Sequence, residues 1–211
     1  HSKRAYLIEP GVYRAKFTQQ AQKLYGKNIE ERRLNLEREI LSEFRTSGAA
    51  LLNPEHIEEM YFIAQHYGIP TRLLDWTMNP LAALFFAACS SDEDGDVFVI
   101  DAKTVIPVPS STDAPKGIIT MRHPFAVDAI RSSFWIKPQK PRPPMILPIR
   151  PDNLPGRIGQ QSSCFTLHMR DSTDCTSATL GCFVIIPRAV LNETLTSRPS
   201  APGPISARWG F

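Results

Sequence analysis

Cysteine is scarce in this chain, and its four cysteines form no C-x-x-C pair. The spacing typical of structural zinc sites and of dithiol redox centres is therefore absent. Cys89 and Cys164 lie among apolar residues, which favours reduced, buried thiols. A disulfide bond between Cys175 and Cys182 stays compatible with the spacing.

Long apolar runs and common catalytic motifs are also missing. No stretch approaches the roughly 18 residues that span a bilayer, and no basic-then-apolar leader opens the chain. We therefore expect a cytosolic protein with no membrane partner. The sequence contains no G-x-S-x-G, G-x-x-x-x-G-K or G-x-G-x-x-G motif, and no histidine has a second ligand at metal-like spacing. Nothing predicts a hydrolase elbow, a P-loop, a Rossmann site or a metal centre.

Acidic residues are few in one part of the chain. The formal net charge is only +3, yet residues 116–170 carry nine Lys or Arg against two carboxylates. Such a bias attracts a polyanion or a nucleotide. The candidate nucleic-acid-binding residues are Lys137, Lys140, Arg142 and Arg157. A solvated basic surface is the competing interpretation, because no aromatic residues are interleaved as a base-stacking platform.

The N-terminal part of the chain carries mainly helical patterns. Residues 9–17 favour a short strand, whereas residues 29–44 alternate charged and apolar residues in helical order. The charged side of that helix, Glu37 included, is expected to face solvent. The residues expected to face the core are Leu34, Ile40, Leu41 and Phe44. Residues 54–64 repeat the helical spacing. Residues 81–88 are apolar on all sides, which predicts a buried helix that begins after Asn79-Pro80.

Strand patterns cluster later. Eleven of the nineteen prolines lie between residues 107 and 155, which excludes long helices there and leaves short extended pieces at 133–136 and 145–147. A turn at 94–96 precedes a predicted strand at 97–100, and further strands are predicted at 164–168 and 182–186. With helices early and strands late, we predict a single α+β domain, in which N-terminal helices pack on a small mixed or antiparallel sheet.

Residues 64–79 hold an unusual density of polar side chains between two apolar stretches. The segment is Ala-Gln-His-Tyr-Gly-Ile-Pro-Thr-Arg-Leu-Leu-Asp-Trp-Thr-Met-Asn. Gly68 and Pro70 suit turns, so we expect a loop held by a helix at each end. A buried ion pair between Arg72 and Asp75 is a structural explanation for part of the pattern.

This segment, continued by Pro80 and by Leu-Phe-Phe-Ala at 84–87, closely resembles the hallmark of the FRG domain. The family is named for an N-terminal Phe-Arg-Gly, and Tyr13-Arg14-Ala15 stands in its place with the aromatic residue and the arginine kept. Arg157-Ile158, Gln161 and Phe165 resemble a later family pattern, although Ser163 replaces a glycine. We therefore divide the chain into a lead or vector-derived remnant at 1–10, an FRG domain at 11–192 and a Pro/Ser/Gly-rich tail at 193–211.

The resemblance implies an ADP-ribosyltransferase-like layout that uses NAD as the ADP-ribose donor. Arg14 would bind the NAD phosphates, Asp75-Trp76-Thr77 would shape the nicotinamide pocket, and Gln161 would lie near the reacting ribose. The candidate catalytic residues are Arg14, Asp75 and Gln161. The candidate NAD-binding residues are Arg14, His66, Tyr67, Thr71, Arg72, Trp76, Thr77 and Asn79.

The reaction asks for chemistry that these residue types supply. Breaking the bond between ribose C1 and nicotinamide places positive charge on the sugar, and a guanidinium binds a diphosphate through bidentate contacts. Gln161 cannot act as a general base, so proton removal would fall to Asp75, His66 or the acceptor itself.

The expected function is transfer of ADP-ribose from NAD to a macromolecule in a toxin or anti-phage role, with an antitoxin as a further expected partner. The basic segment favours single-stranded RNA or DNA over protein as the acceptor. Two alternatives stay open. One is a non-catalytic FRG module that binds nucleic acid or a nucleotide, and the other is an NAD glycohydrolase that uses water as acceptor.

Overall fold

The fold is described from a computed structural model of the 211-residue chain. The structure describes residues 8–24, 26, 28–48, 57–89, 95–102, 115, 117–136, 145–152, 163–169 and 182–186. Contacts within the chain divide it into two compact units. The first comprises His1–Asn79 and Val99–Gly181, and the second comprises Pro80–Phe98 and Cys182–Phe211. Each unit is described by itself.

The first unit begins with two short helical elements, and the strand expected at residues 9–17 is wrong. A 3-10 helix, η1 (Gly11–Tyr13), is followed by α1 (Ala15–Ala21). Every fourth residue from Tyr13 to Ala21 is buried. That spacing places one side of a helix against the core, which a strand would not do.

The long helix α2 (Ile29–Gly48) confirms the helical pattern expected at 29–44. Asn28 caps its start, because the Asn28 Oδ1 accepts a hydrogen bond from the Glu31 backbone N at 2.8 Å. Leu41 is fully buried, as expected. The expected solvent-facing position of Glu37 is wrong, because its side chain is also fully buried.

The second helix, α3 (Ile57–His66), is confirmed as well. After it the chain turns at Gly68, whose φ of +79° lies in the left-handed region that favours glycine. The loop expected across residues 64–79 is wrong in part, because β1 (Leu73–Thr77) is a strand. Its hydrogen-bonding partner comes much later in the chain, so local pattern does not reveal it.

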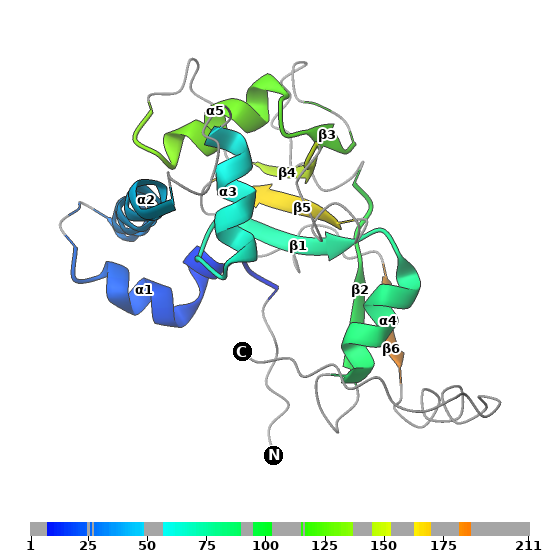
Figure 1. Ribbon diagram of the computed structural model, residues 1–211. Helices are drawn as coiled ribbons and strands as arrows, with labels where there is room; N and C mark the ends of the chain where they lie inside the picture. Colours follow the sequence, from blue (N-terminus) through cyan, green and yellow to red (C-terminus); the bar gives the residue numbers. More distant parts are fainter. Residues whose placement is uncertain are drawn as a thin grey trace, which may run out of the picture. The chain divides into compact units, whose positions relative to one another are not determined.

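A four-stranded mixed sheet forms the centre of the first unit (Figure 1). Its order is β1-β5-β4-β3, with β3 at Ile119–Thr120, β4 at Ile146–Arg150 and β5 at Ser163–His168. β5 runs antiparallel to both β1 and β4, whereas β3 is parallel to β4. The strands expected at 145–147 and 164–168 are thereby confirmed.

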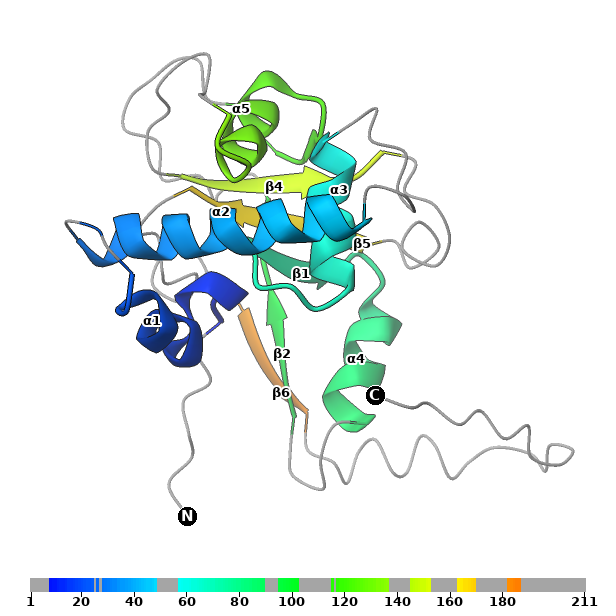
Figure 2. The same cartoon turned by 60° about the vertical axis from the view of Figure 1, so that its left-hand side comes forward.

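Both faces of this sheet are covered. On one face, α2, α3 and α5 (Pro124–Ser132) pack over the strands and share one apolar core (Figures 1 and 2). On the other face, a smaller cluster surrounds Ile146. Residues 165–168 of β5 are consequently all buried, although alternation had suggested a half-buried strand. Each large apolar side chain enclosed in this way contributes about 1.5–3 kcal/mol.

The proline-rich region contains the short helix α5. Pro124 occupies its first turn, where no backbone N–H is needed, and the His123 Nδ1 accepts a hydrogen bond from the Phe125 N at 3.3 Å. Residues 133–136 form a turn and an irregular residue. The extended piece expected there is wrong, since Trp135 adopts a φ of +63°.

The second unit contains α4 (Pro80–Cys89) and a two-stranded sheet of β2 (Gly95–Val99) and β6 (Cys182–Ile186). The expected helix and both expected strands are confirmed, although Gly95 and Asp96 belong to β2 and not to a turn. The expected burial of α4 on all sides is wrong, because Leu81 is 72% and Phe85 60% exposed. A unit of this size has too few residues to cover every side of a helix.

At the level of fold class, the α+β prediction with a small mixed sheet is confirmed. Cys164 is a free thiol, and partial burial raises its pKa. The suggested Cys175–Cys182 bridge and the tail at 193–211 lie outside the described residues. Among the helices that the structure describes, none is long and apolar enough to cross a membrane.

Candidate functional site

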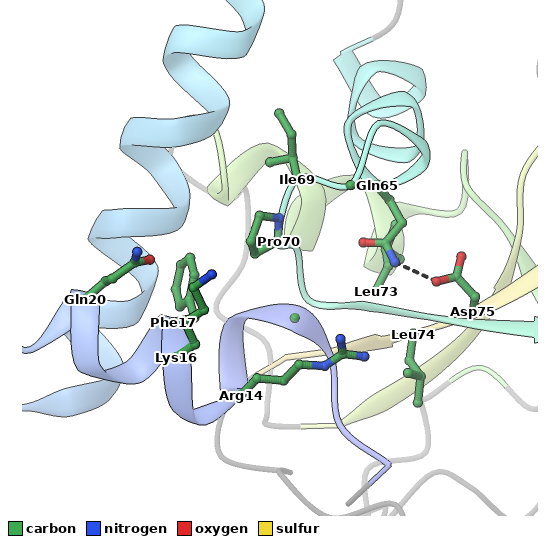
Figure 3. Close-up of a pocket in the computed structure, with 12 residues that line it drawn as sticks. Arg14, Lys16, Phe17, Gln20, Gln65, Ile69, Pro70, Leu73, Leu74 and Asp75 are labelled. Atoms are coloured by element: carbon green, nitrogen blue, oxygen red, sulfur yellow. Dashed lines mark hydrogen bonds between the residues drawn. The ribbon is translucent and has the colours of Figure 1, made fainter. Parts of the chain in front are cut away.

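A pocket of about 510 Å³ opens in the first unit where η1 and α1 face the end of α3 and the start of β1 (Figure 3). Its polar lining residues are Arg14, Lys16, Gln20, Gln65 and Asp75. Apolar groups, among them Phe17 and Ile69, complete the wall. Two cations, two amides and one carboxylate therefore share a single cavity.

A backbone contact holds the two walls of the pocket together. The Val12 N donates a hydrogen bond to the Thr71 O at 3.3 Å. Gly11 lies so close to the opposite wall that an added Cβ would meet the Pro70 Cα at 3.1 Å. The short distance between the walls therefore depends on a residue without a side chain at position 11.

Arg14 stands between η1 and α1 in extended conformation, with φ −62° and ψ 148°. Its side chain reaches from the junction toward β1 (Figure 3). The Arg14 Nε donates to the Glu9 O at 3.4 Å. This bond does not use the two terminal nitrogens, which with Nε form the fork that binds oxyanions.

Asp75 is held by a chain of hydrogen bonds that begins on the backbone. The Leu73 N donates to the Thr71 Oγ1 at 3.0 Å, and the Thr71 Oγ1 donates to the Gln65 Oε1 at 2.7 Å. The Gln65 Nε2 then donates to the Asp75 Oδ2 at 2.7 Å. Because the Thr71 hydroxyl already accepts from Leu73, its single proton points at Gln65 and fixes which end of that amide faces Asp75.

The environment of Asp75 shifts its pKa, although the residue remains exposed to solvent in part. Partial burial raises the pKa of Asp75 above its ordinary value, while the hydrogen bond from Gln65 and the charge of Arg14 lower it in part. A carboxyl group with a raised pKa in a pocket is a candidate proton acceptor.

The segment that builds this pocket is similar to a known protein family. Comparison with known families matches residues 1–96 to the FRG domain. This stretch of the chain resembles an FRG domain. No curated protein and no solved structure gives a significant match to the chain.

The FRG match confirms the resemblance seen at Tyr13-Arg14 and across residues 64–87. The later pattern of Arg157-Ile158, Gln161 and Phe165 lies beyond the matched segment. Of these residues the structure describes Phe165, which is buried in β5 with its ring centroid 5.1 Å from that of Phe62.

Arg72 is buried in the core of the first unit and is not among the residues that line the pocket. Its Nε lies 3.0 Å from the Glu37 Oε2, and its Nη2 donates to the Ala129 O at 2.9 Å and also to the Ser133 Oγ. The residue is only 4% exposed. The expected pairing with Asp75 is therefore wrong. The expected contact with NAD is not supported by this geometry either, because the guanidinium is enclosed.

Tyr61 completes the buried group around Arg72. Its hydroxyl donates to the Glu37 Oε1 at 2.6 Å and accepts from the Arg72 N at 2.9 Å. Burial and the charge of Glu37 raise the pKa of Tyr61. Burial lowers the pKa of Arg72. The attraction of Glu37 outweighs the effect of burial, so the pKa of Arg72 is raised. The carboxylate thus faces one cation and one neutral phenol, which together fix the start of β1 against α2.

The other expected NAD-binding residues are not among the lining residues of the pocket. His66 and Tyr67 are exposed at the end of α3, with their ring centroids 5.9 Å apart. Thr71 is fully buried behind Gln65. Trp76 points to the opposite face of β1 from Asp75, where its Nε1 donates to the Thr166 Oγ1 at 2.9 Å.

Thr77 and Asn79 form a local turn after β1. The Thr77 Oγ1 accepts a hydrogen bond from the Asn79 N at 3.1 Å. The Thr77 hydroxyl therefore stabilises this turn.

Several expected site residues lie outside the described part of the chain. These are Gln161, Lys137, Lys140, Arg142 and Arg157. Within the described part, no three His, Cys, Asp or Glu side chains are grouped to hold a metal ion.

Sequence reasoning missed three polar residues of the pocket, namely Lys16, Gln20 and Gln65. Lys16 and Gln20 are four positions apart on α1, so they share a side once the segment is helical. The expectation of a strand concealed that relation. Gln65 lies inside the FRG hallmark, but its role depends on the position of Thr71 and Asp75 in space.

Proposed function

We propose that the pocket binds NAD and that the protein transfers ADP-ribose from NAD to a macromolecule. The observation that carries the proposal is that Arg14 and Asp75, which come from opposite walls, line the same pocket. The volume of about 510 Å³ falls within the range of about 300–1,000 Å³ common for small-molecule sites.

Arg14 and Lys16 are assigned to the diphosphate. Both line the pocket on the side of α1, and a guanidinium offers a planar fork that matches phosphate oxygens. The ammonium of Lys16 adds a second positive charge. The apolar wall near Phe17 and Ile69 supports the packing of a flat ring, as in most small-molecule sites.

Asp75 is assigned to the reacting ribose. NAD supplies the glycosidic bond, whose electrons leave with neutral nicotinamide while positive charge develops at ribose C1. A carboxylate held in place by Gln65 stabilises that charge without reorganising. The raised pKa of Asp75 also suits it to accept the proton that the acceptor loses when it bonds to C1.

For the acceptor we propose single-stranded RNA or DNA. The support is the charge of residues 116–170, with nine Lys or Arg against two carboxylates, since cationic segments bind nucleic-acid phosphates. Modification of nucleic acid in the cytosol would suit a toxin or an anti-phage factor, and an antitoxin protein would then hold the activity in check.

The test incubates the wild type, Arg14→Ala and Asp75→Asn with NAD that is labelled in its adenylate part. Each protein is incubated with separate pools of RNA, DNA and protein, and the label is followed into each pool. Arg45→Ala is the matched control, because it removes another exposed arginine that is not among the pocket-lining residues. We expect label in one pool, reduced about 100-fold or more in both pocket variants and unchanged in the control.

Two other results would change the assignment. Free ADP-ribose with no labelled acceptor would make the pocket an NAD glycohydrolase site. If NAD is consumed in no pool, the enzymatic proposal fails, and equilibrium dialysis with NAD would then show whether the pocket is a non-catalytic nucleotide site.

A further inference from the structure

The turn after α5 carries an exposed tryptophan in a conformation that favours glycine. Trp135 has a φ of +63°, and no other non-glycine residue in the described part of the chain has a positive φ. Its side chain is bulky, and the residue is 56% exposed. Such a backbone is strained, and burial in the core does not offset the strain.

The fold itself does not require tryptophan at this position. α3 ends in the same hydrogen-bond pattern, with the Ile69 N donating to the Ala64 O at 3.0 Å across Gly68. At the end of α5, the Ile136 N donates to the Arg131 O at 3.1 Å across Trp135. This bond is the hallmark of a Schellman-type helix end, whose left-handed residue is usually glycine. The presence of tryptophan at position 135 is therefore better explained by a property of the indole than by a requirement of the turn.

Arg38 supports one side of the indole ring. Its Cζ lies 4.9 Å from the ring centroid. The Arg38 Nε donates to the Ser132 O at 2.9 Å, and its Nη1 donates to the Asn35 Oδ1 at 3.2 Å. Two hydrogen bonds therefore fix the guanidinium over the ring, while more than half of Trp135 stays open to solvent.

We propose that Trp135, backed by Arg38, is a stacking platform for a base of single-stranded nucleic acid. An open indole stacks on any base, because every base has a π-face. Arg38 places positive charge behind the ring, and the platform lies within the basic span of residues 116–170, which attracts the phosphates. The platform supplies the aromatic element that the sequence pattern did not reveal.

The test measures binding of fluorescein-labelled oligo(U) and oligo(dT) of about twelve nucleotides by anisotropy, without NAD. Trp135→Gly removes the ring but suits the left-handed turn, and Trp135→Phe keeps a smaller ring. We expect Trp135→Gly to bind about tenfold or more weakly than the wild type, with Trp135→Phe in between. The Tm of Trp135→Gly should equal or exceed that of the wild type, because the backbone strain is relieved.

Equal affinity of the wild type and Trp135→Gly would overturn the platform, as would a wild type that binds neither oligonucleotide. A third outcome would also overturn the platform. If the wild type binds no oligonucleotide but sediments with anionic vesicles, and Trp135→Gly does not, the ring contacts a lipid surface. Because NAD is absent throughout, failure here is distinguishable from failure of the proposed transferase.

Discussion

Asp75 carries a charge that the folded protein disfavours. Partial burial raises the pKa of Asp75 above the value of an unfolded chain. The folded state therefore binds more protons than the unfolded state in the acidic range, and the contribution of Asp75 to stability falls as the pH rises through that range. The charge of Asp75 therefore lowers the stability of the folded protein at neutral pH.

Asp75→Asn should consequently raise the Tm at pH 7. The amide keeps an oxygen that can accept from Gln65 but carries no charge to desolvate. The gain should shrink as the pH falls toward about 4 and should be gone below it, where the wild-type carboxyl group is neutral in the folded and the unfolded chain. Differential scanning calorimetry at several pH values measures the difference, and a gain that does not change with pH would contradict the assigned cause.

The hydrogen bond from Gln65 lowers the pKa of Asp75 in part, and Thr71 orients the Gln65 amide. Gln65→Met removes the hydrogen bond to the carboxylate, so the pKa of Asp75 should rise. Thr71→Val should act in the same direction but more weakly, because the Gln65 amide loses only the partner that fixes its orientation. NMR titration of the Asp75 carboxyl carbon gives the pKa directly. Thr71→Ser keeps the hydroxyl and should restore the wild-type value; if it does not, the hydrogen-bond chain is not the cause.

At the scale of elements, Arg72 joins β1 to α2 and α5. Arg72→Met leaves Glu37 buried without its cation, which should lower the free energy of unfolding by about 3–5 kcal/mol. The double variant Arg72→Met with Glu37→Met removes both charges and should recover most of that loss. Urea unfolding followed by circular dichroism measures both. A double variant as unstable as the single one would show that packing, and not the lone charge, dominates.

Local periodicity predicted α2, α3 and α4 and most strands, because their apolar spacing reflects contacts within one element. It failed for β1, whose polar residues are ordered by pairing with distant β5. It also failed for Glu37, because no neighbour in sequence signals that Arg72 will cover it. Arg14 and Asp75, which the sequence pattern singled out, line one pocket. The pattern could not place Arg72, since the same arginine suits a ligand site or a core.

At the scale of the whole molecule, the stability of the protein at alkaline pH should depend on the ionisation of Tyr61. Its pKa is raised in the folded protein by burial and by Glu37. The stabilisation is therefore complete below the unfolded tyrosine pKa of about 10 and is lost as the pH rises beyond it. The Tm of the wild type should fall steeply above about pH 10.

Tyr61→Phe separates this effect from general alkaline denaturation. The variant loses two buried hydrogen bonds, so it should be less stable at pH 7. Its Tm should nevertheless fall less steeply above about pH 10, because no buried phenol remains to ionise. Parallel slopes for the two proteins would exclude Tyr61 as the group responsible.

The close approach of Gly11 to Pro70 sets the distance between the two walls of the pocket. A methyl group at position 11 would meet the Pro70 Cα at 3.1 Å, so the opposite wall would have to move by a few tenths of an ångström to admit it. Larger side chains would require larger displacements. Graded substitution at this one backbone position therefore varies the width of the cavity while every charge in it stays in place, so that fit and electrostatics can be measured as separate variables.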